Sequence, residues 1–285
     1  MKKKIVLIFL LLLISACSAK STTETVEELS TPTPTSLPMA LLVNGEGITV
    51  EEYEAELLRY ALAVEQSGKP IDGEMQKTAV LDELTRQVLL SQCAADQGYF
   101  VDETVLQQRM NDLIQQVGGV EKLNEWMANN FYDEQSFRTA LVRNISAAWM
   151  RDQIIDAVPD TAEQIHARQI FLQNENIAIS IQRQIQAGTP FETIAFQYDS
   201  LTGGDLGWFP RGYLFQPTIE EAAFNLQVGE VSDVIRTDYG FHIIQVIERD
   251  ENRLLSPDAK LLIQRQALEK WLQDKLQESI IEIAV

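Results

Sequence analysis

The sequence predicts an α+β domain inserted in a mostly α-helical domain, because the apolar pattern changes twice along its 285 residues. Residues 50–156 carry apolar side chains at the spacing of amphipathic helices. From residue 165, short apolar runs typical of strands alternate with shorter helical patterns. After residue 256 a long helical stripe returns. One helix cannot bury such a stripe alone, so we expect it to pack on the first helical half.

The helical half begins with an apolar strand at residues 40–43 and a turn at Asn44-Gly45. Thr49 followed by Glu52 predicts a capping box, and a helix should follow over residues 50–66. The remaining helices are expected as a second one that contains Val80, Leu84 and Val88 and ends near Gly98, a third between Asp102 and Gly118-Gly119, a short one around Trp126, and a long one over residues 133–156 that Pro159 ends.

The α+β half is predicted to be compact. Its strands fall at residues 165–172, 206–209 and 241–247. Three helices are expected in this half. One covers residues 177–187, a second begins with a capped start at Thr189-Pro190, and a third covers residues 218–226. The last helix opens at Ser256-Pro257, and its apolar stripe consists of Leu261, Leu268, Leu272, Leu276 and Ile280.

The N-terminus has the pattern of an export signal: three lysines precede an apolar run at residues 5–14, and Ser15-Ala16-Cys17 follows. The run is about half of the roughly 20 residues needed to cross a membrane, so a spanning helix is the weaker interpretation. Small residues before a cysteine resemble the lipobox of bacterial lipoproteins, in which the cysteine is diacylated and becomes the first residue after cleavage. Cys17 is therefore the expected lipid anchor, and an ordinary secretory signal is the alternative.

The composition limits the classes of partner and cofactor that are expected. Residues 18–38 are rich in Ser, Thr, Pro and Glu and predict a disordered or extended spacer. Removal of residues 1–16 moves the formal charge from −19 to −22, with 20 basic against 42 acidic residues. Such a surface repels phosphate backbones, so no nucleic acid partner is expected. With Cys17 lipidated, Cys93 is left for packing, and two histidines and one thiol lack the spacing of a metal site, so no metal or cofactor is expected.

Several blocks over about residues 161–248 carry a specific signal. They are Gly203-Gly204-Asp205-Leu206-Gly207-Trp208-Phe209, Arg211-Gly212, Glu220-Glu221-Ala222-Ala223-Phe224, Gly229-Glu230-Val231-Ser232 and Thr237-Asp238-Tyr239-Gly240-Phe241-His242-Ile243-Ile244. In this order they resemble the parvulin family of peptidyl-prolyl isomerases. The flanks resemble, less closely, the helical domain of extracytoplasmic chaperones of the SurA and PrsA type, through residues 43–49 and Trp271-Leu272. The resemblance implies a parvulin domain at residues 161–250, inserted in a SurA-like chaperone domain formed by residues 40–160 and 251–285.

The resemblance also implies a proline pocket. Its lining would be Leu206, Phe209, Ile219 and either Phe215 or Leu214, depending on where a one-residue insertion lies. Thr237 is expected among the substrate-binding residues. The alternative is that the apolar residues are ordinary members of a small core.

The polar part of the implied site departs from the family. Parvulins carry two histidines on neighbouring strands; His242 matches the second, whereas Gln169 stands at the first. His166 lies three residues away, which places it on the opposite strand face as a surface histidine. Gln169 can both donate and accept a hydrogen bond, so it could hold His242 in one tautomer. It cannot change charge near neutral pH.

The loop before the glycine pair is shorter than in the family, where a Cys or Asp lies close to the amide. Asp199 or Ser200 is expected to fill that role, and these departures predict weak or absent catalysis in an intact fold. The expected function is isomerisation and folding of unfolded or partly folded exported polypeptides at X-Pro segments. A holdase with little isomerase activity is the alternative, and assembly with one dedicated partner is a third interpretation. The sequence leaves a homodimer open.

Overall fold

The computed structural model describes residues 37–68 and 72–285. The expected export signal, Cys17 and the spacer up to residue 36 lie outside these residues. Pro38–Val285 forms one compact unit. Within the described residues, no helix combines the length and the apolar character that crossing a membrane requires.

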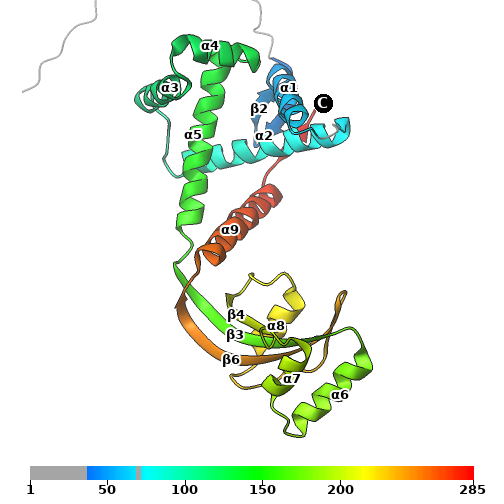
Figure 1. Cartoon of the computed structure of the whole chain (residues 1–285). Helices are drawn as coiled ribbons and strands as arrows, with labels where there is room; N and C mark the ends of the chain where they lie inside the picture. Colours follow the sequence, from blue (N-terminus) through cyan, green and yellow to red (C-terminus); the bar gives the residue numbers. More distant parts are fainter. Residues whose placement is uncertain (1–36, 69–71) are drawn as a thin grey trace, which may run out of the picture. The chain divides into compact units, whose positions relative to one another are not determined.

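The first half is helical, as the apolar spacing predicts (Figure 1). It opens with a hairpin of β1 (Met39–Val43) and β2 (Glu46–Thr49), and the strand β2 was not expected. Asn44 and Gly45 turn the hairpin with φ of 52° and 86°, as a tight two-residue turn requires. The helices that follow are α1 (Val50–Gln66), α2 (Gly73–Asp96), α3 (Glu103–Val117), α4 (Val120–Asn129) and α5 (Glu134–Asp156).

The helix caps follow the sequence with one correction. Asp102 accepts a hydrogen bond from the Val105 amide and caps α3, and Gly118 ends that helix in a left-handed conformation. Thr49 accepts from the amide of Glu52 at 3.1 Å, which is half of the expected capping box. The other half is wrong, because the Glu52 carboxylate accepts instead from the buried Arg143 of α5 at 2.5 Å. This side chain therefore ties α1 to α5.

The C-terminal segment returns to the helical half, as expected. Helix α9 (Pro257–Glu278) packs against α2 and α5, where Leu272 joins a buried cluster with Leu90 and Met150. The predicted stripe is wrong at its ends, since Leu261 is exposed and Ile280 is exposed beyond the end of the helix.

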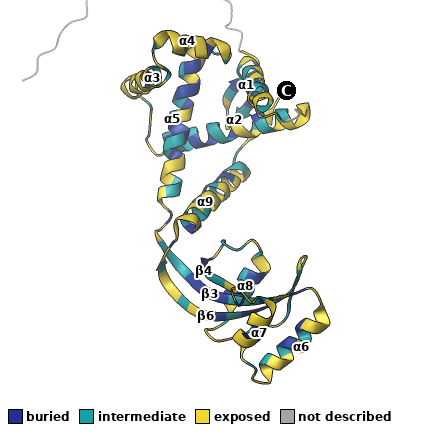
Figure 2. Cartoon of the chain, in the orientation of Figure 1, coloured by how far each residue is buried: buried dark blue, intermediate teal, exposed yellow. Residues whose placement is uncertain are grey.

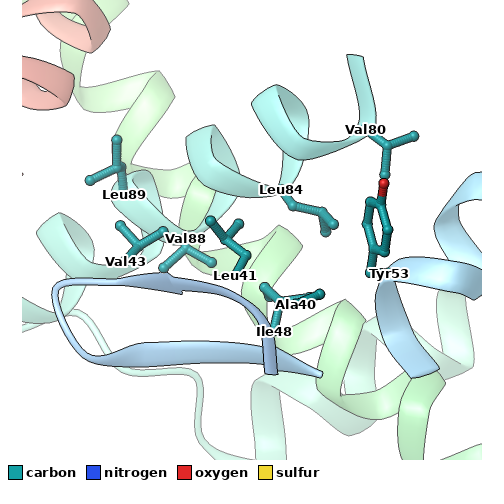
Figure 3. Packing of buried hydrophobic residues seen from close by; sticks show 9 residues of the cluster. All are labelled: Ala40, Leu41, Val43, Ile48, Tyr53, Val80, Leu84, Val88 and Leu89. Carbon is teal, nitrogen blue, oxygen red and sulfur yellow. The ribbon is translucent and has the colours of Figure 1, made fainter. Parts of the chain in front are cut away.

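Two further features lie beside this return. Strand β7 (Ile281–Ile283), which was not predicted, pairs with β1 in a sheet of order β2-β1-β7. Figure 3 shows the cluster where the hairpin packs on α1 and α2. Cys93 is half-buried against the neighbouring cluster on α2, as expected for a packing residue, and burial raises the pKa of its thiol.

The second half is an α+β unit built on an antiparallel sheet of order β4-β3-β6-β5. In Figure 1 the long strands β3 and β6 lie side by side. The elements are β3 (Thr161–Leu172), α6 (Glu175–Gln186), α7 (Phe191–Tyr198), β4 (Asp205–Pro210), α8 (Pro217–Asn225), β5 (Ile235–Thr237) and β6 (Gly240–Leu254).

Three boundaries in this half differ from the prediction. Strand β3 starts before residue 165, and β6 runs to Leu254, past the domain end expected at residue 250. These ends pair with each other, so the mainly polar and charged residues of the extensions are held by the sheet. The expected cap at Thr189 is wrong, because Pro190 is the N-cap of α7 and no side chain caps the helix.

The sheet carries one apolar cluster on each face, because side chains alternate along a strand. Helix α8 packs with Ile165, Phe209 and Ile244 on one face. Helices α6 and α7 pack with Ile170 and Ile243 on the other. Figure 2 shows buried residues concentrated in the middle of β3 and β6. The most buried part of the sheet is therefore the centre of these two strands.

Candidate active site

A chain of three polar side chains crosses neighbouring strands of this sheet. Gln169 lies on β3, His242 on β6 and Thr237 at the end of β5. The Nδ1 atom of His242 lies 3.1 Å from Oε1 of Gln169, and its Nε2 atom lies 3.0 Å from Oγ1 of Thr237. Both ring nitrogens are thus engaged, and the imidazole is held in one orientation.

The partners of His242 determine its tautomer. An amide oxygen can only accept, so Nδ1 carries the proton and donates it to Gln169. Nε2 then accepts the hydroxyl proton of Thr237. Burial lowers the pKa of His242 below its ordinary value, because a charged ring would lose its hydration. The neutral form therefore dominates at pH 7.

The glycine pair brings the preceding loop against Gln169. Gly204 has φ of 71°, and its carbonyl oxygen accepts a hydrogen bond from the backbone N–H of Gln169 at 2.8 Å. A Cβ at this position would lie 1.8 Å from the Gln169 carbonyl oxygen, so no other residue fits without moving the backbone. The glycine is required by this close approach.

Asp199 organises that loop. Its carboxylate accepts from the amides of Leu201 and Thr202 and from the Thr202 hydroxyl, and more distantly from the Gly204 amide. The Thr202 hydroxyl and these backbone amides lower the pKa of Asp199, which stays ionised. Ser200, the other expected residue, is exposed, and the described residues give its hydroxyl no partner. Asp199 therefore shapes the backbone next to Gln169.

The expected pocket residues divide into two layers. Leu206 and Leu214 are half-buried and pack on the α8 cluster. Phe209 and Ile219 lie beneath them, 0% and 4% exposed, as members of the core. Phe215 is 82% exposed and is not part of this apolar surface. The pair that can touch a ligand here is Leu206 and Leu214, which favours Leu214 over Phe215.

Exposed aromatic rings surround the polar chain. The Phe171 ring lies 4.9 Å from the His242 ring, measured between centroids, and Phe171 is 41% exposed. Phe215 meets Tyr239 edge to face at 6.2 Å. The amide of Tyr239 donates to the Thr237 hydroxyl oxygen. The polar chain is thus flanked by the half-buried apolar surface of Leu206 and Leu214 and by exposed aromatic rings.

Glu220 supports the site in a way that the sequence did not reveal. From α8 its carboxylate accepts from three successive backbone amides, Gly212, Tyr213 and Leu214, at 2.6, 2.9 and 2.9 Å. These bonds fix the loop that carries Leu214. The signal was the acidic block that includes Glu220, but only the folded loop shows which amides it meets.

His166 belongs to a separate cluster. Its Nε2 lies 2.8 Å from Asp205 and its Nδ1 lies 3.4 Å from Glu248, while its ring stacks near Trp208. Burial alone would raise the pKa of Asp205, but hydrogen bonds from Gly207 and His166 outweigh it and lower that pKa. His166 does not contact His242, which agrees with its expected place on the other strand face.

The arrangement suits chemistry without a covalent step. Within residues 37–68 and 72–285, no three His, Cys, Asp or Glu side chains are grouped to hold a metal ion. A half-buried apolar surface beside a fixed neutral imidazole can bind an apolar ring and exclude water from the bond next to it.

Comparison with known proteins identifies the family of the chain. Residues 155–250 match the family described as the PPIC-type PPIASE domain. The chain is also 30% identical over 232 residues to the foldase protein PrsA of Caldanaerobacter subterraneus subsp. tengcongensis, which covers 72% of this chain and 71% of the relative. The chain belongs to the PrsA family of foldases. A second PrsA, from Bacillus subtilis, is 28% identical over 222 residues, 73% of each chain. The chaperone SurA of Albidiferax ferrireducens is 26% identical over 255 residues, 73% of this chain and 54% of that one.

The polar chain of side chains lies within residues 155–250, the segment that matches the PPIC-type family. Gln169, Thr237 and His242 all lie inside the matched segment. The fold is a parvulin domain carried in a mostly helical chaperone domain, as the sequence predicted.

Proposed function

We propose that this PrsA-family chain speeds cis–trans exchange at X-Pro bonds of unfolded exported polypeptides and assists their folding. The observation that carries the proposal is the fixed, neutral His242 on the sheet face that also carries the half-buried pair Leu206 and Leu214, which pack on the cluster of Ile244. Uncatalysed exchange takes tens to hundreds of seconds, which is slow enough to limit folding.

The residues act on the amide by surrounding it. Rotation has a barrier of about 18–20 kcal/mol, and the barrier falls when the carbon–nitrogen bond loses its resonance in a twisted form. Leu206 and Leu214 hold the proline ring and keep water from the amide, which would otherwise stabilise the planar forms. Thr237 and Gln169 hold His242 in place, so its ring meets the twisted amide without a reorganisation of its hydrogen bonds.

The rate is expected to be modest. Gln169 stands where the family has the first of its two histidines, and it gives His242 a neutral partner. The Asp199 carboxylate is already occupied by hydrogen bonds within its own loop. These two observations favour the second candidate, a holdase whose parvulin domain binds proline segments and turns them over slowly.

An exchange assay decides between them. NMR exchange spectroscopy on a short X-Pro peptide should show faster exchange with the wild-type protein than without it. His242→Phe should reduce the gain about tenfold or more, whereas Thr193→Ala, an exposed change on α7, should leave it unchanged. If wild type does not speed exchange, the isomerase proposal is rejected and the holdase remains.

The domain plan and the anchor complete the proposal. Residues 40–160 and 251–285 form the chaperone domain, supported by the packing of α9 on α2 and α5, and the run of β6 to Leu254 moves the end of the parvulin insert slightly later. Cys17 carries a lipid that holds the protein outside the cytoplasm. Detergent phase partitioning tests this: after removal of the signal, Cys17→Ala should move the protein to the aqueous phase, and a processed variant that still partitions with membranes would place the anchor elsewhere.

A further inference from the structure

A groove in the helical half lies far in sequence from the residues of the parvulin site. It is about 320 Å³ and lies between α1 and α2. Val80 and Leu84 come from successive turns of α2 (Figure 3). Both line the groove and are nearly buried, so they form its floor. The wall on α1 consists of Glu56 and Tyr60, and the wall on α2 consists of Ala79, Glu83 and Gln87.

The spacing of these residues produces the groove. Glu56 and Tyr60 are four residues apart on α1, and Ala79, Glu83 and Gln87 repeat every four residues on α2. Residues four apart share one face of a helix, so each wall is a single row of side chains. The short side chain of Ala79 makes the α2 wall lower at that position. Sites for small ligands begin at roughly 300 Å³, so this groove accommodates one long side chain and excludes a helix.

The groove has an apolar floor and a carboxylate on each wall. Glu56 accepts from Arg59 at 2.7 Å and from the Tyr132 hydroxyl at 3.5 Å. Both contacts use Oε1, so in the described part of the chain Oε2 remains an acceptor. Glu83 accepts from Gln87 at 2.8 Å, also through Oε1, and it is exposed. One oxygen on each wall is thus left for a ligand.

We propose that this groove binds a lysine or arginine side chain of an unfolded polypeptide. The aliphatic stem of such a residue covers Val80 and Leu84, while its charged head stays at the rim between Glu56 and Glu83. A purely apolar side chain would cover the same floor but take water from two carboxylates without replacing their hydrogen bonds. An acidic side chain would be repelled.

This inference does not depend on the isomerase proposal. The groove contains none of the residues of the polar chain on the parvulin sheet. It gives the helical half a selectivity of its own, for segments in which a basic residue lies between apolar ones. The formal charge of −19 favours the approach of such segments from a distance.

The test uses proline-free peptides and the full chain. Fluorescence anisotropy would compare one short peptide containing Leu-Lys-Leu with the same peptide containing Leu-Gln-Leu or Leu-Glu-Leu. We expect the lysine peptide to bind most tightly and the glutamate peptide most weakly. The preference should shrink at high salt, because the rim is open to solvent.

Two variants that each remove one negative charge separate binding in the groove from attraction by the net charge of the protein. Glu83→Gln should weaken binding of the lysine peptide about fivefold, the size expected of a partly exposed ion pair. Asp82→Asn removes the same charge from the next, exposed residue of α2, which does not line the groove, and should change the affinity less than twofold.

A third variant tests the floor. Ala79→Phe should fill the groove and weaken the lysine and glutamine peptides alike. Circular dichroism would establish that each variant is folded. Equal affinities for the three peptides would overturn the proposal, since the groove would then not select for a basic side chain. Equal effects of Glu83→Gln and Asp82→Asn would also overturn it, since binding would then follow the net charge of the protein alone. Unchanged binding in Ala79→Phe would overturn it as well.

Discussion

At the scale of single residues, the sequence was most informative where strand geometry relates two positions. Gln169 and His242 were expected to meet because each matched a position on a neighbouring strand, and their atoms lie 3.1 Å apart. Asp199 and Ser200 were harder to place, since a loop has no period that fixes where its side chains point. The bonds that Asp199 makes within its own turn appear only in the folded structure.

The role of Gln169 can be tested by restoring the family's residue. Gln169→His should raise the exchange rate on an X-Pro peptide, on the order of tenfold, which needs only about 1.4 kcal/mol of extra transition-state stabilisation. Peptide affinity should change little, because Leu206 and Leu214 are untouched. Exchange rates and affinities would be measured on the same peptide. A wild type that already equals the histidine variant would contradict this placement.

The pH dependence follows from His242. Its pKa is lowered below 6.5 by burial, so the ring stays neutral until the pH falls below that value. Protonation puts a hydrogen on Nε2, which can then no longer accept from Thr237. Exchange should therefore be flat above pH 6.5 and fall below it, with a midpoint lower than 6.5.

Folding stability should change in the same direction. The unfolded state takes up its proton near pH 6.5 and the folded state only at lower pH. The contribution of His242 is therefore constant above pH 6.5 and is lost as the pH falls from 6.5 toward the folded pKa. His242→Phe removes this titration, so an identical acid limb of the stability curve in that variant would contradict the assignment.

The two phenylalanines proposed for the pocket should behave oppositely. Phe209→Ala should cost about 3–5 kcal/mol of unfolding free energy, because the ring is fully buried. Phe215→Ala should stay within about 0.5 kcal/mol of wild type, because the ring is 82% exposed. Denaturant melts would measure both. A large loss in Phe215→Ala would mean that this ring is packed in solution.

At the scale of elements, length decided what the sequence could predict. The helices α1 to α5 and α9 were found because each spans several turns of apolar repeat. The strands β2, β5 and β7 have three or four residues, too few for alternation to be recognised. They form because longer neighbours hold them: β7 pairs with β1, and β5 pairs with β6.

Helix α9 offers a matched pair of leucines for testing its packing. Leu272→Ala should lower the unfolding free energy by about 2–5 kcal/mol, because the side chain is buried against α2 and α5. Leu261→Ala should have an effect within about 0.5 kcal/mol, because that side chain is exposed. Thermal melts of both variants would compare them. Equal effects would show that α9 does not pack through this stripe.

At the scale of the whole chain, the polypeptide leaves one domain and returns to it. The helical half contains both ends of the described chain, since β1 begins at Met39 and β7 ends at Ile283. The sequence indicated this return because the stripe on the last helix needed a distant partner. It could not indicate the sheet that completes it, because β7 has no pattern apart from its pairing with β1.

The division of the chain predicts that holding a client and isomerising it can be separated. The helical half exposes large apolar side chains, among them Phe100, Trp126 and Phe131, and none of them contacts the Gln169–His242–Thr237 chain. Under the proposed function, we expect unfolded polypeptides to be held at such exposed apolar side chains of the helical half. His242→Phe should therefore suppress aggregation of a proline-free client as well as wild type does, in light-scattering assays. The same variant should slow the refolding of a client whose folding is limited by an X-Pro bond, relative to wild type. Loss of both activities together in a folded variant would mean that clients are held at the parvulin site itself.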